Sequence, residues 1–302
     1  MVNGILVLDK PQQFTSFDAV AVMRKLLQTK KIGHTGTLDP MATGVLPILV
    51  GTATRAAELL PESGKTYEAA FQLGIRTDTQ DIWGTVQSQC AVNVSAADVE
   101  RACGPLRGEI MQIPPMMSAI RQNGVRLYDL ARQGIEVERR ARPVTIHELT
   151  VLAYNPADGR GRLRVQCSKG TYIRTLIADL GETLGCGGTM TALRRTMACG
   201  FTLDDAISLE DARKAPETLA AQIRPVDSLF GTVSAVRVTE NQARRFANGG
   251  TLAQDRLAVR KDHTDGDLLR IYDPNGVFLG LAAYRAADNE WFVRRLFLPT
   301  AE

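Results

Sequence analysis

Hydrophobic and polar residues alternate along the first part of the chain with two different periods. Residues 5–8 form a short apolar run that ends in Asp-Lys-Pro, which predicts a buried strand. Thr15 and Asp18 have the spacing of a capping box, and apolar positions three and four residues apart predict a helix up to Leu27. Residues 66–73 place their more apolar side chains on one face, which predicts a half-buried strand.

The middle of the chain mixes the two periods without strict alternation. Residues 32–44 contain three glycines and no period, which predicts a loop, and residues 45–50 follow as a strand that Pro47 confines to an edge or a bulge. Further predicted elements are helices over residues 95–103 and 125–133, a strand over 163–167 and a helix over 173–184. This order favours the α+β class.

The pattern changes again near residues 224–234. A short helix is predicted between Thr239 and Asn248, and three strands follow it at residues 268–272, 277–284 and 291–298. The turn that starts at Asp273 joins the first two strands as a hairpin. We therefore expect two domains, residues 1–230 and a small, mostly β module over residues 234–302.

The composition is that of a globular protein. Apolar residues make up 44% and charged residues 23% of the 302 residues, which argues against disorder and fits about two domains. The apolar runs are much shorter than the ~20 residues that span a bilayer. The N-terminus lacks the basic region that precedes the apolar run of a secretory signal. We expect a cytoplasmic protein without a membrane-spanning helix.

Cysteine and histidine are too scattered to suggest a metal site. The five cysteines form no Cys-x-x-Cys pair, and the three histidines lie far apart in the sequence. Buried, reduced cysteines are the expectation, with no disulfide and no metal.

Positive charge is concentrated in one segment. The chain as a whole carries +3, but residues 101–174 contain 13 Lys or Arg and 6 Asp or Glu, hence +7. Arg139, Arg140 and Arg142 cluster within it, and we expect a surface insertion over about residues 114–145. Clustered arginines suit a nucleic-acid backbone, although any single one also fits a solvated face.

The loop over residues 33–44 carries one carboxylate among small and apolar residues. Pro40 drives Asp39 out of the helical region, and the glycines let a substrate approach the backbone. Two interpretations are equally open on this spacing, an active site or a tight turn in which Asp39 bonds neighbouring amides. The loop lacks the Gly-Lys-Ser/Thr of a P-loop.

Several motifs in order give the chain a family resemblance. They are Gly4 to Pro11 with Thr15-Ser16, Gly33 to Pro47, Lys65-x-Tyr67, Arg76-Thr77-Asp78-Thr79-x-Asp81, Ser168 to Arg174, and Leu193-Arg194-Arg195. With these motifs the chain resembles the TruB family of bacterial tRNA pseudouridine-55 synthases over essentially its full length. One departure is Gln13, which stands where the family usually has glycine.

The resemblance implies a fold and a reaction. It implies an α+β pseudouridine synthase domain with a mixed sheet, an Arg-rich RNA-binding insertion, and a PUA-like C-terminal barrel that binds RNA. The reaction would break the C1′–N1 bond of a uridine flipped out of the T arm of tRNA and join C1′ to C5. This isomerisation needs no cofactor. A monomer without a required protein partner is expected, and a tRNA-folding role could accompany catalysis.

The resemblance also assigns roles to residues. Asp39 would be the nucleophile and Arg174 its partner, while Tyr67 would stack on uracil and take part in proton transfer. Attack at C1′, attack at C6 and a glycal route all stay open. The implied substrate-binding residues are His34, Tyr172, Leu193, Asp81, Lys10 and Lys169. Without the family, core packing explains Tyr67, Tyr172 and Leu193 equally well. Solvated surface charge likewise explains Asp81, Lys10 and Lys169.

Two other classes compete with this interpretation. A transglycosylase could use Asp39 to exchange a base, but that class carries a Cys-rich zinc site, which the scattered cysteines do not match. A non-catalytic RNA-binding protein would fit the arginine cluster and the barrel. It would not require Asp39, Tyr67 and Arg174 together.

Overall fold

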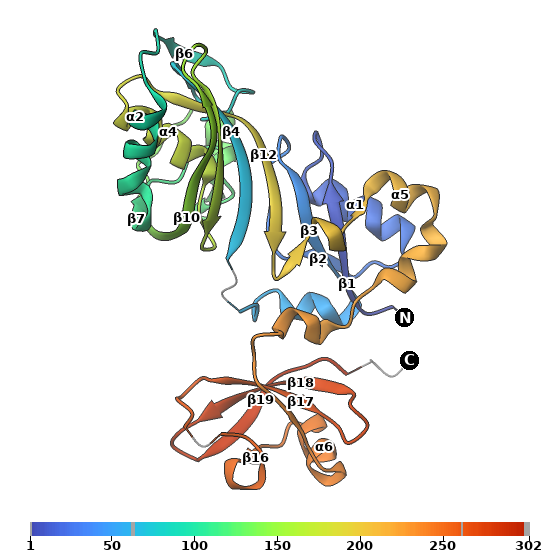
Figure 1. The fold of residues 1–302 in the computed structure, drawn as a ribbon. Coiled ribbons are helices and arrows are strands. Elements are labelled where there is room, and N and C mark those ends of the chain that lie inside the picture. The colour runs from blue at the N-terminus through green and yellow to red at the C-terminus, as the bar shows by residue number, and fades with distance from the viewer. Residues whose placement is uncertain (1, 62–63, 261, 299–302) are drawn as a thin grey trace.

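The computed structural model describes residues 2–61, 64–260 and 262–298, which build two parts around separate β-sheets (Figure 1). Within these residues the large sheet has ten strands in the order β14-β1-β3-β12-β4-β11-β10-β7, with β2 beside β3 and β13 beside β12. Its strands are β1 (Gly4–Lys10), β2 (Ile32–His34), β3 (Thr43–Val50), β4 (Lys65–Leu73), β7 (Gly108–Gln112), β10 (Arg142–Asn155), β11 (Arg160–Cys167), β12 (Gly188–Ala198), β13 (Phe201–Thr202) and β14 (Ile207–Ser208). The β1–β14 and β3–β12 pairs are parallel and the others antiparallel, so the sheet is mixed.

Four helices cover one face of the large sheet. Figure 1 shows α2 and α4 at one end of the sheet and α1 and α5 at the other. All four contribute side chains to one apolar core with β1, β3, β4 and β11. The helices of the described residues are α1 (Ser16–Leu26), α2 (Ala96–Cys103), α3 (Leu127–Arg132), α4 (Ile173–Thr183), α5 (Leu209–Lys214) and α6 (Glu240–Ala247).

The second sheet forms the C-terminal part, drawn in orange and red in Figure 1. Its five strands in the described residues run in the order β15-β17-β18-β19-β16 and curl around Trp291 and Phe246, which are fully buried. Their bounds are β15 (Ala235–Arg237), β16 (Leu252–Ala253), β17 (Leu268–Tyr272), β18 (Phe278–Arg285) and β19 (Glu290–Leu296). The predicted α+β class, with a mixed sheet and a small β module, is confirmed. Residues 299–302 of that predicted module lie outside the described residues.

The two parts share an apolar core, because β1 is buried on both faces. Leu6 and Leu8 of β1 pack under the helices, whereas Ile5 and Val7 face the other way. On that side they join a cluster to which the C-terminal part contributes Leu281 and Phe297. Phe230 belongs to the same cluster, with its ring centroid 6.0 Å from that of Phe297. A strand with two buried faces is continuously apolar, which explains the uninterrupted run at residues 5–8.

Local signals predicted most of the elements and their caps. The Thr15 hydroxyl accepts the backbone N–H of Asp18, and the Asp18 carboxylate accepts the N–H of Thr15, so the predicted capping box is confirmed. The predicted helix over residues 125–133 is shorter, Leu127–Arg132, and follows a small hairpin of β8 (Arg121–Gln122) and β9 (Val125–Arg126). A second hairpin pairs β5 (Ile75–Thr77) with β6 (Val86–Gln89).

Two predictions about the glycine-rich segment are wrong. Residues 32–34 are strand β2 rather than loop, and β3 lies inside the sheet rather than at its edge. Pro47 is tolerated there because β3 changes partner beside it. Thr43 pairs with β12, Ile48 pairs with β2, and between them Pro47 only accepts a hydrogen bond, from the N–H of Thr35 at 3.2 Å.

Candidate active site

The loop that carries Asp39 is fixed by the start of α1. The Ser16 hydroxyl accepts the N–H of Leu38 at 2.8 Å and donates to its carbonyl at 3.2 Å. The N–H of Gln13 donates to the carbonyl of Pro40 at 2.8 Å. The backbone on both sides of Asp39 is therefore immobilised, and its carboxylate is left 38% exposed.

Gln13 adopts a backbone conformation that favours glycine. Its φ is 67°, in the left-handed region, which explains physically why glycine suits this position. The turn nevertheless closes, since the Gln13 N–H reaches the Asp39 loop. The departure from the family pattern therefore leaves the turn in place.

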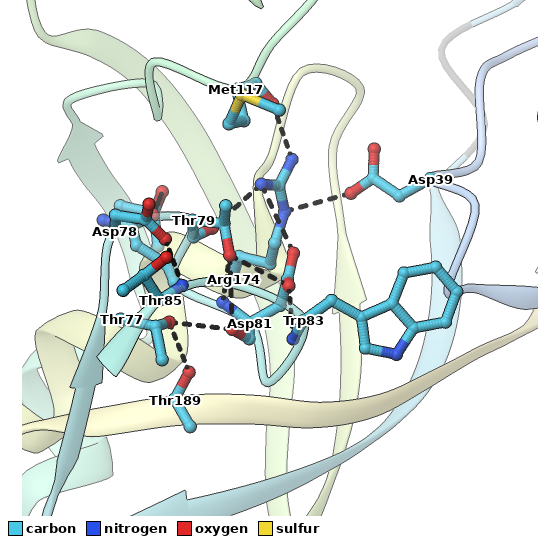
Figure 2. Close-up of polar contacts among 12 residues, drawn as sticks. Asp39, Thr77, Asp78, Thr79, Asp81, Trp83, Thr85, Met117, Arg174 and Thr189 are labelled. Carbon is cyan, nitrogen blue, oxygen red and sulfur yellow. Dashed lines mark hydrogen bonds and ion pairs between the residues drawn. The ribbon is translucent and has the colours of Figure 1, made fainter. Parts of the chain in front are cut away.

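Arg174 lies at the centre of the site. It projects from the first turn of α4, its side chain is only 5% exposed, and its Nε lies 3.0 Å from Oδ2 of Asp39. Nη1 donates to the carbonyl of Thr79 at 3.0 Å and Nη2 to that of Met117 at 2.9 Å (Figure 2). A guanidinium held on three sides fixes the position of the carboxylate that it contacts.

Arg195 is a site residue to which the sequence analysis gave no role. It is fully buried, and its Nε donates to the carbonyl of Val45 at 2.7 Å. Its Nη2 and Nη1 donate to the carbonyls of Gly36 and Thr37 at 3.2 and 3.4 Å. The Arg195 side chain therefore hydrogen-bonds the backbone on both sides of the Asp39 loop. The alternation of β12 could have indicated this position, because Arg195 is two residues after Leu193 and so lies on the same, inward-facing side of the strand.

Tyr67 faces the same centre from β4. It lies opposite Arg195 of β12 and is buried, and burial raises the pKa of its phenol, an effect that the Arg195 charge opposes. The phenol is therefore neutral near pH 7 and has a proton to donate. Asp39 therefore contacts Arg174 and lies within electrostatic range of Tyr67.

Asp81 lies beside Arg174, Tyr172 precedes Arg174 at the start of α4, and Leu193 shares β12 with Arg195. Asp81 is buried, its Oδ2 lies 3.7 Å from Nη1 of Arg174, and burial raises its pKa. The N–H of Tyr172 donates to Oε1 of Gln112 at 3.0 Å, and burial raises the pKa of its phenol. Leu193 is buried on β12, next but one to Arg195.

The other predicted binding residues lie in different environments. Lys10 is fully buried, and its Nζ donates to the carbonyls of Pro11 and Phe14 at 2.9 and 2.6 Å. Burial lowers the pKa of Lys10 to about 8, and its buried ammonium group offers no exposed charge for the substrate contact that the resemblance implied. Burial also lowers the pKa of His34, whose buried Nδ1 has no partner within the described residues. Lys169 is exposed on the loop before α4.

The described residues do not bring three or more His, Cys, Asp or Glu side chains together as metal ligands. In the part of the chain that the structure describes, no helix has the length and apolar character to cross a membrane.

Solved structures share this fold. A chain of a Cbf5-Nop10-Gar1 complex superposes with a TM-score of 0.76 at 26% identity, covering 98% of this chain and 85% of that one. A chain of an H/ACA RNP bound to a substrate RNA containing 2′-deoxyuridine gives 0.75 at 25% identity, with 98% and 85% covered.

Comparison with family models identifies the protein family to which the chain belongs. The family model described as TruB family pseudouridylate synthase (N terminal domain) matches residues 24–173. Those described as tRNA pseudouridylate synthase B C-terminal domain and as Pseudouridine synthase II TruB, C-terminal, match residues 174–231 and 234–296. The chain belongs to the TruB family of pseudouridine synthases and is therefore an isomerase, as the motifs indicated.

Two curated relatives are each named tRNA pseudouridine synthase B. The one from Aromatoleum aromaticum is 46% identical over 283 residues, which cover 93% of this chain and 88% of the relative. The one from Burkholderia mallei (strain NCTC 10247) is 43% identical over 302 residues, which cover 99% and 98%.

Proposed function

We propose that this protein isomerises the uridine at position 55, in the T loop of tRNA, to pseudouridine, with Asp39 as the nucleophile. The observation that carries the proposal is the partly exposed Asp39 carboxylate held 3.0 Å from the buried Arg174 guanidinium. The relatives' common name, tRNA pseudouridine synthase B, supports tRNA as the substrate.

The side chains divide the chemistry among them. Asp39 supplies the negative charge that drives detachment of the base, and Arg174 keeps that charge in place. The uracil turns between Tyr67, Tyr172 and Leu193, and its C5 joins C1′. The proton lost from C5 balances the one gained at N1, so atoms and electrons balance within the uridine, and the neutral Tyr67 phenol is placed to take part in the transfer.

Binding of the T arm falls to the rest of the molecule. An unpaired loop base costs least to extrude, and Asp81 and His34 hold extruded nucleotides. The insertion over residues 114–145 and the domain over residues 234–302 hold the arm by its phosphates. Residues 1–230 perform the chemistry, and the protein acts in the cytoplasm as a monomer without a protein partner.

Site mapping tests this proposal. Purified protein is incubated with an unmodified tRNA transcript without any added cofactor, and pseudouridine is mapped by nucleotide. One new pseudouridine at position 55 is expected, and none in a transcript that carries cytidine there. Pseudouridine only at other positions, or only when a cofactor or a second protein is added, would contradict the proposal.

A further inference from the structure

One large aromatic side chain beside the active site is left in solvent. Trp83 is 51% exposed, whereas the only other tryptophan of the chain, Trp291, is fully buried in the C-terminal part. Within residues 2–61, 64–260 and 262–298 the indole makes no hydrogen bond, ring contact or cation contact. The exposed Phe17, by contrast, has the Arg24 guanidinium 5.7 Å from its ring.

The turn that presents Trp83 is rigid. The Trp83 N–H donates to Oδ1 of Asp81 at 3.0 Å, and the N–H of Ile82 donates to the carbonyl of Met190 at 2.8 Å. Gly84 closes the turn with a bond from its N–H to the Asp81 carbonyl at 3.1 Å. An indole held by such a backbone loses little conformational entropy when something stacks on it.

The same contacts tie the indole to the reacting group. Asp81 accepts the Trp83 N–H through one carboxylate oxygen and lies 3.7 Å from Arg174 through the other, and Arg174 contacts Asp39. Figure 2 shows the ring projecting from the turn toward the side on which the Asp39 carboxylate lies. The nucleotides that flank a uridine bound at Asp39 are joined to it covalently, so an exposed ring on this side of the site is available to one of them.

We propose that Trp83 is a stacking platform for an unpaired nucleobase adjacent to the target uridine. This inference rests on the proposed function, since it requires an RNA loop at Asp39. A flat, uncharged ring without polar partners suits the face of a base, not a phosphate, and stacking on tryptophan tolerates any base. Trp83 thereby adds a nucleobase subsite to the groups that surround Asp39.

Affinity for a T-arm hairpin is measured in an Asp39→Asn background, so the result does not depend on turnover. Trp83→Ala is expected to weaken binding by between about 5- and 150-fold, and Trp83→Phe to restore most of it. Ile82→Ala, which removes the neighbouring exposed side chain, is the matched control and should change affinity by less than about threefold. Circular dichroism checks that each variant is folded.

An abasic scan identifies the contact. Hairpins that lack one base at a time on either side of the target are bound to the Asp39→Asn protein and to its Trp83→Ala derivative. At one position the missing base should abolish the difference between the two. Binding should also quench Trp83 fluorescence, while the buried Trp291 of the Trp83→Ala protein stays unchanged.

Two results would overturn the inference. One is an unchanged affinity of Trp83→Ala, and the other is a difference that persists at every abasic position, because the ring would then contact sugar, phosphate or protein. If the hairpin binds and Trp83 behaves as expected but wild-type protein forms no pseudouridine, the proposed function fails and the stacking subsite stands.

Discussion

The buried and the exposed cations of this protein differ in what they bind. Arg174 and Arg195 are both buried and donate to backbone carbonyls. Those bound by Arg174 belong to Thr79 and Met117, and those bound by Arg195 lie on both sides of the Asp39 loop. Arg162 and Arg164 are exposed, and each pairs with Glu68 at 3.5 Å. A guanidinium bound by several carbonyls fixes a loop, whereas a solvated pair at that distance is worth little to stability and leaves the charge free for a ligand.

The difference shows that a cluster of arginines in the sequence does not mark the position of the active site. The segment over residues 101–174 drew attention because its arginines cluster. Of the two arginines that organise the site, Arg195 of β12 lies outside that segment, and Arg174 of α4 is its last residue, far from the cluster at residues 139–142. We therefore expect changes to buried cations to alter stability or the chemical step, and changes to exposed cations to alter binding.

The largest effect is expected at Arg195. Arg195→Met leaves the carbonyls of Val45 and Gly36 without their donor in the interior, which should lower the free energy of unfolding by about 4 kcal/mol. Denaturant titration measures it. The neighbouring Arg194 is partly exposed and pairs with Asp9, so Arg194→Met should cost under about 1 kcal/mol. Equal losses of stability for the two variants would contradict the distinction between buried and exposed arginines.

Arg174→Lys should next affect the chemical step. One ammonium cannot bond Asp39, Thr79 and Met117 together, so the single-turnover rate should fall by about 100- to 1,000-fold. Affinity for tRNA should stay within about threefold. The matched control is Arg164→Lys at an exposed position, for which no change of rate is expected. A large loss of affinity at an unchanged rate would place Arg174 among the RNA-binding cations.

Exposed arginines of the insertion should act on affinity alone. Reversing Arg126, Arg132 and Arg140 to Glu is expected to weaken tRNA binding by about 10- to 100-fold and to lower the salt slope by about 2 to 3. Replacing the same three by Lys keeps the charge and should restore most of the affinity. A reduced single-turnover rate at saturating enzyme would show that the insertion helps to build the site.

Lys10 should produce the smallest effect, visible through pH. Its pKa is about 8 in the fold and about 10.4 in an unfolded chain, so between these values the unfolded state binds more protons. The stability of the wild type relative to Lys10→Met should therefore rise as the pH increases from 8 to 10. A difference that stays flat or falls over this range would show that Lys10 keeps its charge in the fold.

Much of the fold was predictable because its signals are local. Capping residues and alternation predicted α1, β4 and the hairpin of β17 and β18 within a few residues. The packing of the C-terminal part against β1 was not predicted, since no local pattern shows that Leu281 and Phe297 pack with Ile5 and Val7. Such contacts depend on tertiary packing between distant segments.

The candidate site was predictable only where a motif carried it. Asp39, Arg174 and Tyr67 came from the family resemblance, since spacing alone left a tight turn or core packing open. Without the family, Lys10 was explained by solvated surface charge, and only the structure shows that it is buried. Trp83 was overlooked because exposure is not visible in sequence.

The role of Asp39 is tested most directly by single-turnover isomerisation of an unmodified tRNA transcript by Asp39→Asn at saturating protein. The amide keeps the volume of the side chain and removes its charge. We expect affinity close to that of the wild type and a rate at least about 10,000-fold lower. Substantial pseudouridine formation by this variant would contradict the assignment of Asp39 as the nucleophile.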